Sequence, residues 1–457
     1  MRVTSEDILS GPLVPTLYRM IWPAVVGHLV LISFGVVDTF FISLLGSQQL
    51  AAITFTLPVN LLLYNLMFGL GIGASILVGQ LIGRDGIENA ARASSAVLLL
   101  GSLIAIIIAI IGYLTIDPLF ILLGASKSTL PYIREYMVIW YLCTIFLFFP
   151  VIGNSILRAT GDTRMPSMIM VMVGLLNAFL DPILIFGLGP FPEMGIEGAI
   201  TATVISWMVA CFGIFWLLHI RDGLITLKFT SAHVFRRFWG RLIAVSGPIS
   251  LSNMMMPVAM AALTWLVARH GDIAVAGMGA GGRIEFFAMS VTFAMATSLA
   301  PFMAQNIGAG NTQRVRQSLF ACLKFTILFQ LAAVFLFAAG SQWFAGIFTD
   351  EPQVESVARL YLLIMPMGAA LYAILMVFNT SFNSHQLSHL TLFSNAIRVF
   401  VFYIPLIWLG NSLMGLTGVF FGAVIANGLG TLLGWYLYKT RCAPLDNPSK
   451  TLTSKPA

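Results

Sequence analysis

The sequence has very few charged side chains for its length. Asp, Glu, Lys and Arg together make up 9% of the 457 residues, whereas apolar residues make up 58%. A soluble protein averages about 25% charged residues, so this chain cannot cover itself with a water-soluble surface. Most of its surface is therefore expected to face the lipid bilayer, and the length leaves no room for a large soluble domain.

Cysteine is also scarce, and the four cysteines share no motif spacing. Three of them lie in apolar segments, so we expect buried thiols and no disulfide.

The first residues lack the ordered basic flank, short apolar run and small-residue cleavage site of a secretory signal peptide. The first apolar helix is therefore expected to stay in the protein as a membrane anchor. No cofactor is expected.

Long apolar runs, bounded by Gly, Pro and charged residues, fill the chain. At about 20 apolar residues per membrane helix, the length allows about twelve crossings. The predicted helices cover residues 15–45, 50–81, 92–115, 130–158, 164–187, 196–219, 240–268, 273–307, 314–339, 355–382, 389–409 and 415–438. The fold class predicted from this pattern is an all-α membrane protein.

Lys and Arg are distributed unevenly between the two sides of these helices. Of the 24, 18 lie on the side that holds both termini, four lie on the opposite side, and Arg283 and Arg398 lie inside helices. Basic loops stay in the cytoplasm, so we expect a multi-pass protein of a bacterial-type inner (plasma) membrane with both termini cytoplasmic. Because the basic residues are spread along one membrane face, nucleic-acid binding is not expected.

The second half of the sequence repeats the first. A shift of 225 residues aligns eight identical residues without a gap, and a shift of 220 aligns a Met-Gly-x-x-Gly segment. The pairs are Pro23 and Pro248, Gly46 and Gly271, Ala51 and Ala276, Gln80 and Gln305, Gly83 and Gly308, Arg134 and Arg359, Tyr136 and Tyr361, Asn154 and Asn379, and then Met194–Gly198 and Met414–Gly418. Such agreement indicates duplication.

Each copy contains six predicted helices, so both copies have the same orientation in the membrane. The two six-helix bundles should be related by a pseudo-twofold axis along the membrane normal. The expected organisation is an N-terminal lobe over 1–220, a cytoplasmic linker over 221–240, a C-terminal lobe over 241–441 and a cytoplasmic tail over 442–457. Two such lobes around a central cleft favour a monomeric alternating-access transporter over an enzyme.

Acidic residues inside membrane helices are costly and usually functional. Asp38 lies 16 residues past Trp22, and Asp181 lies 17 residues past Arg164 in a helix that runs in the same direction, so both are expected in the outer half of the membrane. Asn177 lies one turn from Asp181 on the same helix face. Tyr136 and Thr201 begin neighbouring helices at the same level. We therefore predict one polar cluster of these five residues in the N-terminal lobe.

This cluster has no counterpart in the second half, where Leu263 stands at the position that matches Asp38. Two carboxylates in a low-dielectric medium do not both ionise easily, so one of them is expected to hold a proton near neutral pH. The same oxygens could bind Na+. The sequence therefore predicts coupling to H+ or Na+ in the first lobe, and it does not choose between the two ions. No other metal site is expected.

The second half offers a candidate substrate cavity. Glu285 lies next to Arg283 and could form a local ion pair or provide the countercharge for a cationic substrate. Phe286, Met256 and Met289 lie near it in the predicted helices, and Met and Phe surfaces adapt to varied apolar shapes. These residues would suit organic cations and drugs, although packing or lipid contact is the simpler interpretation of most of them.

At this point the sequence resembles the MATE (multidrug and toxic compound extrusion) family over about residues 14–440. The segments that carry the resemblance are GVVDTFFISLLGSQQLAAITFTLPV (35–59), GQLIGRDGIENAARAS (79–94), LRATGDTRMPSM (157–168), MGIEGAITAT (194–203) and AQNIGAGNTQRVRQS (304–318). The resemblance implies antiport of amphipathic organic cations driven by H+ or Na+.

The polar pattern further resembles the DinF-type branch of that family. This resemblance adds Asn154 to Asp38, Tyr136, Asn177, Asp181 and Thr201, with Thr203 as the alternative in that helix. It also implies that the first helix bends at its proline, which Pro23 and Gly35 would permit. The acids that the NorM-type branch carries in helices 7 and 10 are missing here.

Three other functions are considered. A lipid-linked oligosaccharide flippase of related architecture would need a basic cavity, and only Arg283 and Arg398 are intramembrane cations. An intramembrane prenyltransferase would need two aspartate-rich motifs, and the second half contains none. An ion channel is not favoured by a single asymmetric cluster.

Overall fold

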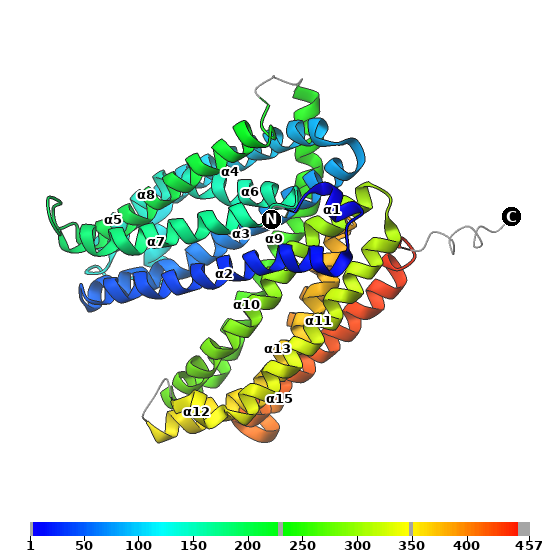
Figure 1. Ribbon diagram of the computed structural model, residues 1–457. Helices are drawn as coiled ribbons and strands as arrows, with labels where there is room; N and C mark the ends of the chain where they lie inside the picture. Colours follow the sequence, from blue (N-terminus) through cyan, green and yellow to red (C-terminus); the bar gives the residue numbers. More distant parts are fainter. Residues whose placement is uncertain (1–2, 227–231, 347–350, 447–457) are drawn as a thin grey trace. The chain divides into compact units, whose positions relative to one another are not determined.

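A computed structural model of the chain describes residues 3–226, 232–346 and 351–446. These residues form helices joined by short connections, with no strand among them (Figure 1). Lipid offers no hydrogen-bond partner to a peptide group, so a spanning segment must satisfy its own backbone, as a helix does. The predicted all-α class is confirmed.

The first half of the chain contains eight α-helices and a final π-helical turn among the described residues. They are α1 (Ser5–Leu9), α2 (Leu13–Ser43), α3 (Ser47–Asp85), α4 (Ile87–Leu122), α5 (Leu130–Leu142), α6 (Ile145–Ala159), α7 (Arg164–Phe186), α8 (Gly195–Trp216) and η1 (Leu217–Arg221). The predicted helix over 130–158 is in fact the pair α5 and α6, which meet at 51°. At this break the Thr144 hydroxyl donates to the Trp140 carbonyl at 2.9 Å, a contact that commonly bends helices.

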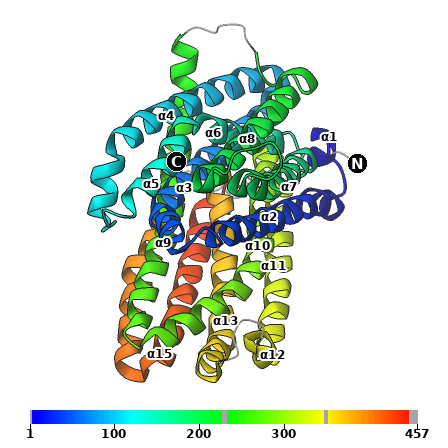
Figure 2. The same ribbon diagram turned by 90° about the vertical axis from the view of Figure 1, so that its left-hand side faces the viewer.

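The second half has a matching series. It contains α9 (Ala232–Ala268), α10 (Asp272–Gly308), α11 (Thr312–Ala339), α12 (Ser341–Gly346), α13 (Pro352–Ser384), α14 (Ser388–Ala396), η2 (Ile397–Tyr403), α15 (Ile404–Leu437) and η3 (Tyr438–Cys442). Figures 1 and 2 show α10, α11, α13 and α15 side by side.

The spans agree with the predicted number. Among the described residues, ten helical segments are long and apolar enough to cross a membrane, and the bent pair of α5 and α6 is an eleventh. One of the ten, 388–442, holds two of the predicted spans, because its backbone leaves the helical region at Gly415 (φ 60°, ψ −140°). The described chain therefore contains the twelve predicted spans.

The chain forms two compact units whose boundaries follow the repeat. The first unit contains residues 1–5 and 22–246, and the second contains residues 6–21 and 247–457. Besides the boundary after residue 5, the other two lie just before matched prolines, Pro23 in α2 and Pro248 in α9. Both helices therefore contribute their first part to one unit and the remainder to the other.

This division differs from the expected one. The segment 221–240 is not simply a linker, because it begins with the last residue of η1 and ends inside α9; its residues 227–231 lie outside the described part. The start of the expected tail is also ordered, since the Asp446 carboxylate accepts from His385 Nε2 at 3.0 Å. The rest of that tail, 447–457, lies outside the described residues.

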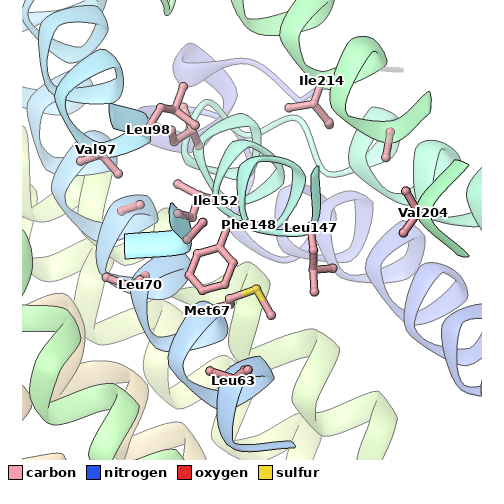
Figure 3. Packing of buried hydrophobic residues seen from close by; sticks show 14 of the residues in the cluster. Leu63, Met67, Leu70, Val97, Leu98, Leu147, Phe148, Ile152, Val204 and Ile214 are labelled. Atoms are coloured by element: carbon pink, nitrogen blue, oxygen red, sulfur yellow. The ribbon is translucent and has the colours of Figure 1, made fainter. Parts of the chain in front are cut away.

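The core of the first unit is made of aliphatic and aromatic side chains, mainly from α3, α4, α5, α6, α7 and α8. Figure 3 shows Met67 and Leu70 of α3 facing Phe148 and Ile152 of α6. On another side of α6, Gly153 allows a close approach to α8, because a Cβ at that position would overlap the Ile214 side chain of α8. This core fixes the helices that carry the polar residues of the unit.

The second unit holds the N-terminal segment 6–21 through an arginine of α11. Arg314 donates from Nε to the Ile8 carbonyl at 2.7 Å and from Nη2 to the Gly11 carbonyl at 2.7 Å and the Asp7 carbonyl at 3.2 Å. The Asn306 amide also donates to the Ile8 carbonyl, at 3.2 Å. These carbonyls follow or end α1, where a helix leaves acceptors unpaired.

We expect two glycines matched by the repeat to be required for packing. A Cβ at Gly198 would lie 2.5 Å from the Leu184 carbonyl oxygen, and one at Gly418 would overlap the Gly410 carbonyl. Backbone atoms cannot move aside easily, so Gly198→Ala and Gly418→Ala should each lower stability by about 1–3 kcal/mol. Thermal unfolding in detergent measures this. Gly213→Ala is the control, because its new methyl would meet only Ile169 at 3.8 Å; an equal loss in all three variants would contradict the packing argument.

Candidate functional site

The predicted polar residues of the first unit lie on five helices: α2, α5, α6, α7 and α8. Asn177 and Asp181 are one turn apart on α7, and the Asn177 amide donates to the Asp181 Oδ1 at 3.0 Å. The same amide lies 3.3 Å from the Thr203 hydroxyl of α8, which in turn donates to the Ala199 carbonyl at 3.1 Å. Asn177 therefore joins α7 to α8 and orients one face of the Asp181 carboxylate.

The second carboxylate comes from α2. Asp38 is close enough to Asp181 and to the Tyr136 hydroxyl of α5 for their charges to influence one another. The structure therefore brings together Asp38, Tyr136, Asn177 and Asp181, as the sequence predicted.

Each aspartate has one carboxylate oxygen without a described hydrogen-bond partner. Asp181 is fully buried, and among the described residues neither its Oδ2 nor the Asp38 Oδ1 has a hydrogen-bond partner. A buried ionised oxygen without a partner is strongly disfavoured. A proton satisfies such an oxygen, and so does a hard cation such as Na+, which prefers carboxylate, amide and hydroxyl oxygens. Asp38, Asp181 and Thr203 provide oxygens of this kind.

Two predicted members are placed differently. The hydroxyl that reaches Asn177 belongs to Thr203 and not to Thr201, two residues earlier on α8. Asn154 of α6 is buried, and its Oδ1 has no partner in the described part of the chain. The contacts described for the two aspartates do not include Asn154, which lies one turn before the buried Arg158.

One member of the cluster was not anticipated. Tyr64 of α3 lies within electrostatic reach of Asp38 and of Tyr136. The only sequence signal for it is a tyrosine within a long apolar run, which is equally typical of packing. The sequence predicted a helix over this run, but it did not show which face of α3 meets the aspartates.

The helix that carries Asp38 continues as one α-helix past Pro23. Proline removes one backbone donor and weakens the helix at this point, and it lies at the boundary between the two units. At Gly35, a Cβ would have no atom within 4 Å. Close packing therefore does not require glycine there, so any role of Gly35 concerns the freedom of its backbone.

The second unit contains its own acid, Glu285 of α10. Its partner is the hydroxyl of Tyr361 on α13, which is the repeat counterpart of Tyr136. The described ion pairs do not join Glu285 to Arg283, and Arg283 is exposed. A tyrosine at the same repeat position thus faces a carboxylate in both units.

The side chains predicted to line a substrate cavity with Glu285 have mixed environments. Phe286 is 56% exposed and Met256 is 40% exposed. Met289 is half-buried, and its sulfur accepts from the Gln330 amide at 3.8 Å. Phe286 and Met256 are therefore exposed side chains, whereas Met289 packs within the second unit. In the described part of the chain, no three His, Cys, Asp or Glu side chains come together as a metal site.

Comparison with known proteins gives a consistent result. The MatE family model matches residues 23–183 and 248–409, once in each half. A "FAD transporter" of Shewanella oneidensis is 36% identical over 96% of this chain and 97% of its own length. "Multidrug export protein MepA" of Staphylococcus saprophyticus is 26% identical over 92% of each chain. A crystal structure of the Vibrio cholerae MATE transporter VcmN in the bent form superposes with a TM-score of 0.89 and 30% identity, covering 97% of this chain and 99% of that one.

Proposed function

We propose, from the premise that the chain belongs to the MatE family of membrane transporters, that it exports small organic molecules in exchange for H+ or Na+. Membership of a transporter family excludes the prenyltransferase alternative. The observation that carries the coupling proposal is the pair Asp38 and Asp181, each with a buried carboxylate oxygen that lacks a described partner. Entry of one cation yields about 2.3 kcal/mol per 100 mV of membrane potential.

Coupling requires that the cation changes the state of the protein. Binding of a cation removes the repulsion between Asp38 and Asp181, and Asp38 stands on the helix that contains Pro23. We propose that α2 bends at Pro23, with Gly35 adding backbone freedom, when the cation binds. A related protein of known structure, VcmN, has been crystallised in a bent form.

Amphipathic organic cations are the first candidate cargo. The similarity to a multidrug export protein supports it, and Glu285 supplies a buried carboxylate in the second unit. The exposed Phe286 and Met256 would contribute apolar contacts to such a cargo. In this proposal the transporter is a monomer in a bacterial inner membrane, with both termini in the cytoplasm.

A flavin nucleotide is the second candidate cargo. It is favoured by the relative with 36% identity, which is named a FAD transporter and aligns along nearly the whole chain. A flavin has a planar aromatic ring, as many multidrug substrates do, but FAD also carries negatively charged phosphates. The two candidates therefore differ mainly in the charge that the protein must accept.

The proposed function is tested in proteoliposomes loaded with ethidium or FAD, with a pH gradient and a Na+ gradient imposed separately. We expect one of the two gradients to accelerate export, and its collapse by an ionophore to remove the acceleration. Export at the same rate with and without each gradient would contradict cation coupling. Exchange that needs no gradient would then identify a facilitator.

The role of Thr203 gives a direct prediction. Thr203→Val removes the hydroxyl next to Asn177 and leaves that amide with one partner fewer, which costs about 1 kcal/mol. Gradient-driven transport should fall several-fold. Thr201→Val makes the same chemical change two residues away and should transport at the wild-type rate; the opposite ranking in a transport assay would restore Thr201 to the cluster.

A further inference from the structure

A buried arginine of the second unit is not used by the proposed coupling mechanism. Arg398 lies on η2, the π-helical segment between α14 and α15. Segments of this kind are rare and occur frequently at functional sites. Arg398 is only 2% exposed, and none of the described ion pairs includes it.

The side chain is held in place by neutral groups. Its Nη1 donates to the side-chain Oδ1 of Asn427 at 2.9 Å, and its Nε donates to the side-chain Oδ1 of Asn395 at 3.4 Å. Asn395 is itself fixed by donating to the Ser252 hydroxyl at 2.7 Å. The Tyr372 ring lies 4.4 Å from the guanidinium carbon. The guanidinium is therefore positioned from several helices, but none of these contacts neutralises its charge.

A glycine at position 430 makes space for the Arg398 side chain. A Cβ at position 430 would lie 2.7 Å from the Arg398 Cγ. Gly430 therefore leaves room for the stem of the arginine, and any larger residue would displace it.

One end of the guanidinium has no partner. In the described part of the chain, the buried Nη2 makes no hydrogen bond. An unpaired donor of a buried cation is strongly unfavourable unless something occupies it. The only acid that shares an electrostatic neighbour with Arg398 is Glu285, through Tyr403, among the interactions described.

We propose that the Nη1–Nη2 edge of Arg398 binds an oxyanion, a phosphate or carboxylate, carried by the transported molecule; this deepens the proposed function and rests on it. The planar guanidinium fork matches the two oxygens of such a group, and a charge-assisted pair of this type is strong in a low-dielectric medium. Nη2 is covered in this structure. The half-buried Tyr372, which lies over the guanidinium, is the side chain that moves to admit the anion.

The test compares two ligands that differ only by a phosphate, riboflavin and riboflavin 5′-phosphate. Binding to the full-length protein in phosphatidylcholine nanodiscs is followed by flavin fluorescence. The variants are Arg398→Gln, which removes the charge, and Arg398→Lys, which keeps the charge but loses the fork. Arg359→Gln is the matched control, because it removes an exposed guanidinium from the same unit.

We expect the wild-type protein to bind the phosphate ester at least about 10-fold more tightly than riboflavin. Arg398→Gln should weaken binding of the ester by about 10- to 100-fold and leave riboflavin within about twofold. Arg398→Lys should give an intermediate value, and Arg359→Gln should match the wild type. The melting temperature of Arg398→Gln should not fall, because the substitution removes an uncompensated buried charge.

Several results would overturn the proposal. The first is that neither flavin binds, that the wild type does not discriminate between them, or that Arg398→Gln keeps the discrimination. The second is loss of the phosphate preference in phosphatidylglycerol nanodiscs, which would assign the site to a lipid phosphate. The third is that Arg398→Gln lowers the melting temperature without changing the affinity for either flavin, and that the additional substitution Glu285→Gln restores the melting temperature. Arg398 would then be a counter-ion of Glu285. Failure of gradient-driven transport alone would refute the proposed function and leave the binding result standing.

Discussion

Asp38→Asn should abolish gradient-driven export while the protein still folds and inserts. Asparagine has nearly the same shape as a protonated aspartate, but it cannot take up or release a proton and binds Na+ less strongly. Substitution removes one of the two charges that make cation binding favourable at the site. Export in proteoliposomes under the active gradient should fall to the level of protein-free vesicles.

The control for this variant is Asp117→Asn, the same chemical change at a partly exposed ion pair with Arg134 on α5. Exposed ion pairs contribute little to stability, so this variant should export at nearly the wild-type rate. Equal yields and melting temperatures of both variants would show that neither has unfolded. Normal export by Asp38→Asn would eliminate the coupling role of Asp38.

Arg314→Ala should release the N-terminal segment from the second unit. The change removes three hydrogen bonds from a cation to the carbonyls of Asp7, Ile8 and Gly11. The Ile8 carbonyl keeps its bond from Asn306, so two carbonyls lose their side-chain partner. At the lower end of about 1.5–3 kcal/mol for a hydrogen bond to a charged group, we expect a loss of about 3 kcal/mol. Hydrogen exchange of residues 5–11 should become about 100-fold faster, since a tenfold change corresponds to 1.4 kcal/mol.

Arg316→Ala provides the comparison, because Arg316 is an exposed residue two positions along the same helix. Its side chain contacts the Phe320 ring of α11 and should have no influence on exchange in the N-terminal segment. Unchanged exchange in Arg314→Ala would mean that apolar contacts such as the buried Ile8 hold this segment without the arginine.

The fold could be predicted closely because the membrane restricts the possibilities. Apolar length sets the number of spans, so the twelve predicted spans appear, although some ends shift by up to eight residues, as at the start of α9. The bend between α5 and α6 could not be predicted, because a hydroxyl that donates to its own helix, as Thr144 does, has no signature in the hydrophobic pattern.

The site was predicted to the level of helix and depth but not of rotation. Counting residues along the helices placed Asp38 and Asp181 at one level, and the four-residue spacing placed Asn177 and Asp181 on one helix face. The choice between Thr201 and Thr203 depends on how α8 turns toward α7, and a shift of two residues rotates a side chain by about 200° around the axis. Tyr64 was missed for the same reason.

The two halves differ in the acids that they carry, and the structure shows this difference in more detail than the sequence. The paired aspartates are confined to the first half, as the repeat alignment indicated. The structure adds that Tyr361, the counterpart of Tyr136, meets Glu285 on α10. Duplication has thus kept the tyrosine in both units, while the acid that it faces comes from a different helix in each.

The central claim is that Asp38 and Asp181 bind the cation that is exchanged for the cargo. The most direct measurement is the affinity for a fluorescent cargo in nanodiscs as a function of pH and of Na+ concentration. Exchange implies linkage, so the cation that drives transport should weaken cargo binding to the wild-type protein. We predict that this dependence disappears in Asp38→Asn and in Asp181→Asn. The same dependence on pH and Na+ in the wild type and in both variants would contradict the account.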